Sequence, residues 1–212
     1  MPHCCGNEAE IQILHQRQGT VLKAVLAINA IMFIVEVVAG ILARSTALLA
    51  DSLDMFGDAL VYGFSLYVIA RGAKWRAAAA LLKGLIMAAF GMAVLSEAIY
   101  KMLSPVVPSA ETMGAIGLLA LFANAICLAL LWRHRGDDIN MRSTWLCSRN
   151  DVIANLAVLL AAGGVWLMQS MWPDLLVGLV IAALFLRSAF HVTGESLKAL
   201  KGVSPGKMYK VK

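Results

Sequence analysis

The sequence predicts an all-α membrane protein, a bundle of six transmembrane helices with both termini on the cytoplasmic side. Of the 212 residues, 60% are hydrophobic and only 15% are charged, whereas a soluble domain carries about 25% charged residues. One membrane crossing takes roughly 20 apolar residues. The chain therefore has room for about six crossings, and its length excludes a large soluble domain.

Six apolar runs separated by short polar connections make up most of the chain. The expected helices cover residues 21–43, 47–70, 77–103, 112–132, 145–169 and 174–192. These runs predict three regions: a polar cytoplasmic leader (residues 1–20), a six-helix transmembrane domain (residues 21–192) and a basic cytoplasmic tail (residues 193–212). The leader has no apolar core of the kind that a cleaved signal peptide needs.

Polar residues interrupt the first three runs at positions that lipid would not tolerate without a partner. The first run contains Asn29 and Glu36, and a connection of three residues follows it. Ser45 or Thr46 in that connection can cap the second helix. The second run contains three aspartates, and the third ends before a Ser-Pro pair that disfavours continuation of a helix.

The last three runs follow the same pattern. The fourth contains Asn124, and the fifth opens with the polar segment 147–151. Pro173 marks the turn before the sixth run. A helix that carries such residues inside a membrane needs partners on its neighbours, so we expect a closely packed bundle.

The placement of Lys and Arg predicts the orientation of the bundle. One side of the membrane would take only Arg44 and Lys101. The other side would take the tail lysines together with Arg17, Lys23, Arg71, Lys74, Arg76, Arg133, Arg135 and Arg142. The net charge of +5 is explained by orientation signals and by contacts with anionic lipid headgroups. Nucleic acid is therefore not expected as a partner, whereas the lipid bilayer is.

Two polar clusters within the apolar runs have the spacing of metal ligands. Asp51, Asp54 and Asp58 share one face of the second helix, and a carboxylate inside a membrane is a candidate functional group. Cys147 and Asp151 are also four residues apart. If the two helices meet, Asp54, Asp58, Cys147 and Asp151 provide four ligands, which is the number that Zn²⁺ favours. The thiolate would extend the preference to softer ions such as Cd²⁺.

Charge counting suggests how such a site would couple to protons. Three carboxylates and a thiolate cannot all remain ionised together at low dielectric, so some of them should hold protons when no metal is bound. Metal binding must release those protons. We therefore expect a proton-coupled antiporter without a separate cofactor, in which a divalent metal ion is the cargo and protons are the counter-ion. Simple counting leaves one difficulty, because Asp151 would lie about two helical turns farther than Asp58 from the outer helix ends.

Structural roles for the aspartates remain open beside the metal-binding role. Asp54 and Asp58 could pair with Lys83 or Arg149 inside the bundle. Asp51 could cap the second helix, form an ion pair or act as a direct ligand, and we expect a supporting role.

The remaining polar residues also have alternative roles. Cys147 could be an inert buried residue. Asn29, Asn124 and Asn155 could form hydrogen bonds between helices, and Asn155 could instead support Asp151 from one turn away. Glu36 could belong to a proton route or serve packing.

The leader contains a possible metal-capture segment. His3, Cys4 and Cys5 could deliver soft metal ions to the bundle, or they could belong to a disordered leader. Three adjacent ligands alone form a weak site.

The two clusters carry a resemblance to a known family. Residues 47–58 resemble the second-helix motif of the cation diffusion facilitator family, in which a His or Asp precedes an Asp by four residues. Residues 147–155 resemble the fifth-helix His-x-x-x-Asp motif of that family. The similarity extends from about residue 20 to residue 200, and in the first helix it rests on Asn29, Glu36 and Gly40.

The resemblance implies a transport site formed by Asp54, Asp58, Cys147 and Asp151. It also implies export of Zn²⁺ or a similar ion in exchange for protons, and a homodimer. Cys147 stands where the family usually has His, which admits Cd²⁺, Hg²⁺ or Co²⁺. Most members continue into a cytoplasmic metal-binding domain after the sixth helix, so we expect a short member that lacks this domain.

Two other classes of function are weighed against transport. A non-transporting membrane sensor or assembly protein could bind the metal without moving it. An intramembrane metalloenzyme could use the same ligands, but it would need an open coordination position and a general base. No enzyme is expected, because the serines lack a His base at a plausible spacing. Small size, short loops and the lack of a sorting signal favour the inner membrane of a bacterium.

Overall fold

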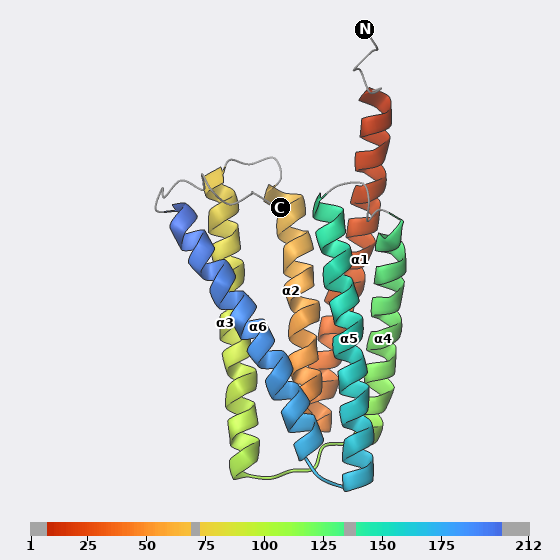
Figure 1. Ribbon diagram of the computed structural model, residues 1–212, viewed down its shortest axis with the longest axis vertical. Coiled ribbons are helices and arrows are strands. Elements are labelled where there is room, and N and C mark those ends of the chain that lie inside the picture. Colours follow the sequence, from red (N-terminus) through yellow and green to blue (C-terminus); the bar gives the residue numbers. More distant parts are fainter. Residues whose placement is uncertain (1–7, 69–72, 134–138, 201–212) are drawn as a thin grey trace, which may run out of the picture.

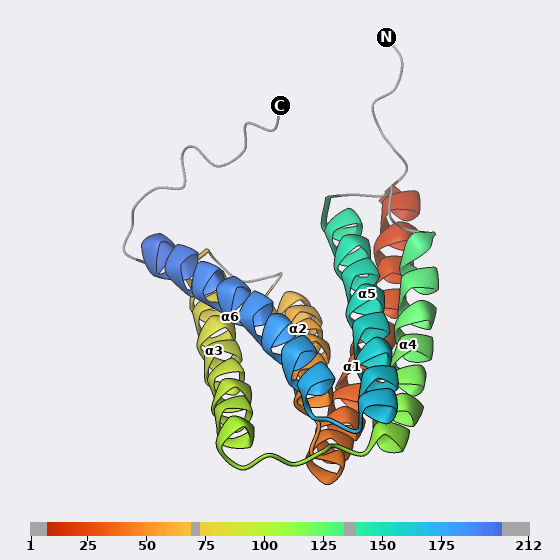
Figure 2. The same ribbon diagram turned by 60° about the horizontal axis from the view of Figure 1, so that its bottom comes forward.

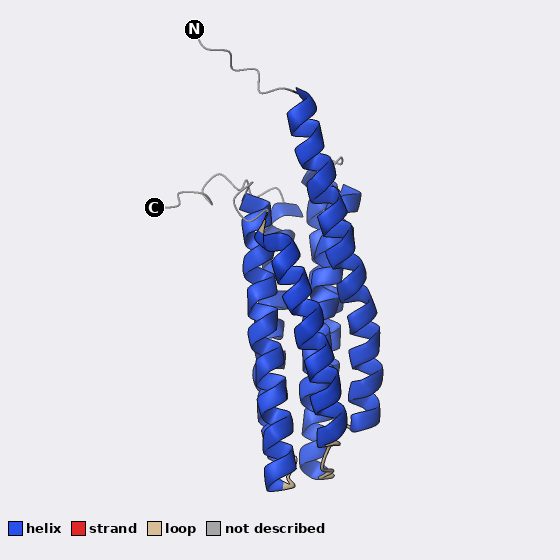
Figure 3. Cartoon of the chain, turned by 90° about the vertical axis from the view of Figure 1, so that its right-hand side faces the viewer, coloured by secondary structure: helices blue, strands red, loops and turns tan. Residues whose placement is uncertain are grey.

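Six α-helices and no strands form the part of the chain that the structure describes (Figures 1 and 3). The structure is a computed structural model that describes residues 8–68, 73–133 and 139–200. The helices are α1 (Glu8–Ala43), α2 (Thr46–Val68), α3 (Ala73–Leu103), α4 (Ala110–Trp132), α5 (Ile139–Met168) and α6 (Trp172–Leu200).

The helices alternate in direction, so that the start of α1 and the end of α6 lie at the same end of the bundle (Figure 1). We call the opposite end, which holds the α1–α2, α3–α4 and α5–α6 connections, the distal end. Helix α2 is central, because it packs against α1, α3, α5 and α6. Helix α6 begins beside α5 at the distal end and diverges from it toward α3 (Figure 2).

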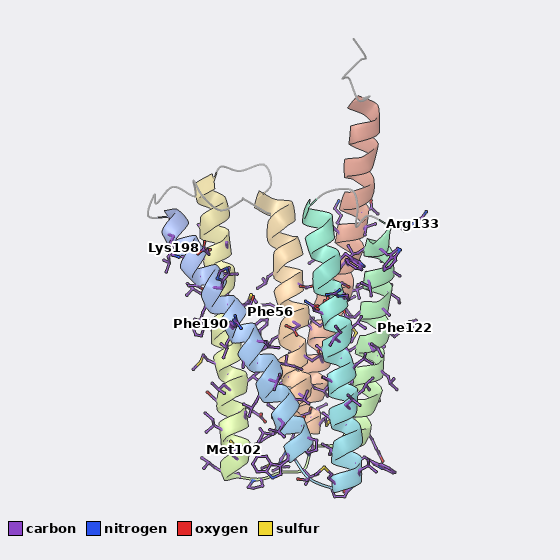
Figure 4. All side chains as sticks on the ribbon, in the orientation of Figure 1. Phe56, Met102, Phe122, Arg133, Phe190 and Lys198 are labelled. Atoms are coloured by element: carbon purple, nitrogen blue, oxygen red, sulfur yellow. The ribbon has the colours of Figure 1, made fainter. Side chains whose placement is uncertain are left out.

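Five of the helices contain segments that are long and apolar enough to cross a membrane. These segments are Gly19–Ala43, Ala80–Leu103, Ala110–Trp132, Ser148–Met168 and Trp172–Lys198. Helix α2 has 23 residues, but every 18-residue window of it contains all three aspartates. Large apolar side chains such as those of Met102, Phe122 and Phe190 project outward from the bundle (Figure 4). The chain is therefore an integral, multi-pass membrane protein.

Three helices extend beyond the ends that hydropathy predicts. Helix α1 begins at Glu8 instead of near residue 21, and α5 begins at Ile139 instead of near residue 145. Helix α6 continues to Leu200 instead of ending near residue 192. Hydropathy marks only the stretch that suits lipid, whereas helix ends follow backbone hydrogen bonding, and Glu, Gln and Lys favour helix in water as well. Residues 8–20 of the predicted leader therefore belong to α1.

The connection between α1 and α2 has two well-defined helix caps. Arg44 adopts a left-handed conformation with φ of 52°, and the Ser45 N–H donates a hydrogen bond to the Gly40 carbonyl over 2.9 Å. This is a Schellman ending. The Ser45 hydroxyl then accepts a hydrogen bond from the Leu48 N–H over 3.1 Å. Ser45 is therefore the cap of α2, as predicted.

Aromatic packing fixes the rotation of α2 about its own axis. The Phe56 ring lies 4.6 Å from the Phe33 ring of α1 and 5.0 Å from the Phe90 ring of α3, measured between centroids. Phe56 is two residues from both Asp54 and Asp58, which places it on the opposite face of the helix. Packing on one face thus turns the aspartates toward the other helices of the bundle.

Candidate metal site

Helices α2 and α5 bring two of the predicted metal ligands into contact. The side chains of Asp58 and Asp151 form a hydrogen bond with each other. Asp54 lies within electrostatic range of Asp151 and of Asp58. The expected difference in depth does not arise, because α5 extends farther at the distal end than the start of α2 (Figure 1). The second and fifth helices therefore meet at their acidic residues.

Asp51 belongs to a separate hydrogen-bond chain that links three helices. The Asn155 side-chain amide of α5 donates to the Asp51 carboxylate over 2.6 Å, and the Asn124 amide of α4 donates to Asn155 over 2.8 Å. The interhelical role expected for Asn124 and Asn155 is confirmed. Asp51 is not the cap of α2, since Ser45 holds that position. Asn155 supports Asp51 through this bond, whereas the sequence had suggested support of Asp151.

Helix α1 contributes two buried polar residues whose oxygens lack hydrogen-bond partners. Glu36 is fully buried, and neither of its carboxylate oxygens has a partner in the part of the chain that the structure describes. Its carboxyl group is within electrostatic range of Asp51, Asp54 and Asp151. Asn29 donates to the Val25 carbonyl of its own helix over 2.9 Å. Its amide oxygen has no partner among the described residues, so the structure shows no bond from Asn29 to another helix within this part of the chain.

Several predicted residues fall outside the described side chains. Cys147 lies in α5 and Lys83 lies in α3. Neither side chain is among those that the structure describes. His3, Cys4 and Cys5 also lie outside the described residues. Among the side chains that are described, no three of His, Cys, Asp and Glu are arranged to hold a metal ion.

Two further side chains near the site have defined surroundings. Arg149 is exposed, and its guanidinium lies over the Trp145 ring at 5.9 Å from the centroid. The thiol of Cys127 in α4 is buried and within electrostatic range of Asp58 and Asp151. Sequence reasoning assigned no role to Cys127. Its spacing of three residues from Asn124 is the signal that both face α5.

A polar cluster at the distal end of the bundle was not predicted. The fully buried Asp174 carboxylate of α6 accepts hydrogen bonds from the Ser45 hydroxyl at 2.6 Å, the Thr46 N–H at 2.8 Å and the Ala47 N–H at 3.0 Å. It thereby binds the positive end of the α2 dipole. We call this group, together with Lys101, the distal clamp.

Lys101 completes the distal clamp from α3. Its ammonium group lies 3.3 Å from the Asp174 carboxylate and donates to the Thr46 hydroxyl over 2.8 Å. It also donates to the Arg44 carbonyl, and Glu97, one turn earlier in α3, lies 3.5 Å away. Two sequence signals could have indicated the clamp: the four-residue spacing of Glu97 and Lys101, and an aspartate in the first turn of α6.

The helical fold and the acidic side chains that meet between facing helices define a multi-pass membrane protein with a carboxylate cluster inside the bundle. Residues 22–201 match the model of the cation efflux transmembrane domain. The chain therefore belongs to the cation efflux, or cation diffusion facilitator, family. Proteins of this family are transporters, and the protein is not an enzyme.

The chain is similar to several bacterial transporters. It is 27% identical over 211 residues to the cadmium, cobalt and zinc/H(+)-K(+) antiporter of Bacillus velezensis. This alignment covers 91% of the chain and 67% of the relative. The cation efflux system protein CzcD of Alcaligenes sp. is 24% identical, over 84% of this chain and 60% of the relative. The zinc transporter ZitB of Escherichia coli is 26% identical, over 84% of this chain and 61% of the relative.

Proposed function

We propose that the protein exports a divalent metal cation, Zn²⁺ or a similar borderline or soft ion, in exchange for protons. The observation that carries the proposal is the contact between Asp58 of α2 and Asp151 of α5. Each residue ends a pair with a spacing of four residues, so Asp54 and Cys147 complete the ligand set. Relatives named for export of zinc, cadmium and cobalt support the choice of cargo.

The same contact supports protons as the counter-ion. A hydrogen bond between the carboxyl groups of Asp58 and Asp151 requires one of them to hold the proton. A divalent cation binds carboxylates in the ionised form, so its arrival must displace that proton. The counter-ion is then the proton that the ligands themselves hold before the metal binds. One relative is named as an antiporter that exchanges metal for H⁺ and K⁺.

In this proposal all six helices cross the membrane, with both termini in the cytoplasm. The alternating helix directions and the Lys and Arg distribution support this topology. Helix α2 crosses despite its aspartates because its acidic face lies within the bundle. A reporter that is active only outside the cytoplasm, fused after Lys212, should remain inactive, and an active fusion would contradict the topology.

The site would alternate between the two sides of the membrane. Helix α6 diverges from α5 away from the distal end (Figure 2). A homodimer in a bacterial inner membrane remains a prediction from the family and from chain size. Chemical cross-linking of the protein in native membranes tests the dimer, and recovery of the monomer alone would contradict it.

Radiolabelled Zn²⁺ uptake into vesicles that contain the purified protein tests the proposed function. Asp58→Asn and Asp151→Ala should each lower the uptake rate by about a hundredfold or more, since ligand loss removes a metal–oxygen bond. Glu111→Gln is the matched control, because this exposed carboxylate at the start of α4 lies in no ligand set. Metal binding and proton release without uptake in the wild type would instead indicate a sensor.

A further inference from the structure

Glu36 of α1 and Asp51 of α2 lie at the same level of the two helices, and Asp51 is about 10 Å from Asp58 along α2. Met32 of α1 and Met55 of α2 pack in the same apolar cluster. The two helices run in opposite directions, so one turn toward the distal end leads from Met32 to Glu36 and from Met55 to Asp51. Electrostatic interaction between the two carboxyl groups agrees with this register.

The burial of the Glu36 carboxylate is energetically unfavourable. It is fully buried, and neither oxygen has a hydrogen-bond partner in the described part of the chain. Burying a polar group without a hydrogen-bond partner is unfavourable, and burying a charged group without one is more so. A protonated Glu36 would still need an acceptor for its O–H group, and a proton shared with Asp51 would require a direct hydrogen bond. Neither contact is present among the described residues, so these residues do not satisfy the carboxyl group even when it holds a proton.

The polar side chains joined to Asp51 offer oxygen atoms as ligands. Asn155 donates to Asp51 and is itself held by Asn124. The amide oxygen of Asn124 is buried and has no partner among the described residues. This second observation, independent of the two carboxylates, supplies another acceptor on a third helix. A site with only oxygen donors favours hard cations, whereas a thiolate favours softer ones.

We propose that Glu36 and Asp51, with the Asn155–Asn124 pair behind them, form a second cation site that binds a hard ion: K⁺, Na⁺ or Mg²⁺. This site is separate from the transport site of Asp54, Asp58, Cys147 and Asp151. As a binding site it stands without the proposed function. Its use as the position of a counter-ion during metal export rests on that function, because a hard cation there and a metal at Asp54 and Asp151 repel each other at short range.

The test measures thermal unfolding of the purified full chain in a buffer from which Zn²⁺ has been removed with a chelating resin beforehand. K⁺, Na⁺ and Mg²⁺ are titrated separately against choline at constant ionic strength, and an ion that binds the folded state raises the unfolding temperature in a saturable way. At least one of the three should do so in the wild type. Glu36→Gln and Asp51→Asn should each raise the half-saturating concentration by about tenfold or more, and Glu36→Asp should restore part of the loss.

Two controls keep this result distinct from the transport site. Glu111→Gln removes an exposed carboxylate and should leave the titration unchanged. Asp58→Asn should retain the hard-cation response while losing Zn²⁺ binding. The inference is overturned if no ion exceeds choline, if Glu36→Gln and Asp51→Asn respond like Glu111→Gln, or if Asp58→Asn alone abolishes the response. Because uptake is not measured, failure of this test leaves the transport proposal unaffected, and failure of transport leaves this test unaffected.

Discussion

The contact between Asp58 and Asp151 sets the chemistry of the protein at the scale of single residues. Both side chains end in carboxylates, which bind most divalent metal ions and so discriminate little between them. Selectivity must then come from the remaining ligands. Cys147 is the proposed ligand that departs from the family motif, whereas Cys127 packs with Val25 and Leu131 in an apolar cluster. The two cysteines of the bundle should therefore have different roles.

Replacing Cys147 by His should move the metal preference from Cd²⁺ toward Zn²⁺. Imidazole is a harder ligand than thiolate, and we expect the Cd²⁺/Zn²⁺ ratio of uptake rates to fall by about tenfold, which corresponds to about 1.4 kcal/mol. A metal panel in reconstituted vesicles measures the ratio. Cys127→Ser is the matched control and should leave the ratio unchanged. A ratio that responds to Cys127→Ser and not to Cys147→His would contradict this assignment.

Sequence spacing predicted part of the site and missed another part for a physical reason. The four-residue spacing places Asp54 with Asp58, and Cys147 with Asp151, on shared helix faces. The helical repeat alone determines which residues share a face, so the sequence is enough to predict these pairs. The partner of Asp51 could not be found this way. Asn155 lies 104 positions away, and which helices meet depends on packing. The same holds for Glu36. That its carboxylate oxygens lack hydrogen-bond partners among the described residues can be seen only in the three-dimensional structure.

The distal clamp determines stability at the scale of helices. It joins the start of α2, the end of α3 and the start of α6 through Asp174 and Lys101. Close packing accompanies it, since a Cβ atom at Gly178 would lie 2.7 Å from the Thr46 backbone. The helix that carries the aspartates is therefore held firmly at its distal end, and relative motion of the helices should concentrate at the opposite end.

Asp174→Ala should destabilise the folded protein by about 3–5 kcal/mol, because it removes the fully buried partner of Lys101 and the acceptor of the Ser45, Thr46 and Ala47 hydrogen bonds. The double variant Lys101→Met with Asp174→Leu should recover part of that loss, since neither charge then remains buried. Denaturant unfolding in detergent measures both. Glu195→Ala is the control, because its pair with Lys198 is at the surface and should contribute about 0–1 kcal/mol. Equal effects of Asp174→Ala and Glu195→Ala would refute the role of the clamp.

Hydropathy predicted the number and order of the helices but not all of their ends. The apolar runs for α2, α3 and α4 begin and end within a few residues of the helices, because those ends coincide with charged or Pro-containing connections. The early start of α1 and the late end of α6 could not be predicted in this way, since polar helix continues there. The clamp escaped prediction because it joins three segments that are distant in sequence.

The two ends of the molecule as a whole differ in how the helices are joined. The distal clamp joins α2, α3 and α6 at one end, while α6 leaves α5 for α3 toward the end that holds the termini (Figure 2). The buried carboxylates lie between these two regions. This arrangement suits a protein that exposes one ion site alternately to two sides of a membrane.

Zn²⁺ flux under an imposed pH gradient tests the central claim most directly. The purified protein is reconstituted into vesicles, and Zn²⁺ entry is followed with equal pH on both sides or with an acidic interior. Because metal binding must displace protons from Asp58 and Asp151, an acidic interior should drive Zn²⁺ accumulation above the external concentration, and a protonophore should abolish that accumulation. Zn²⁺ flux that is the same with and without the pH gradient would contradict proton-coupled export.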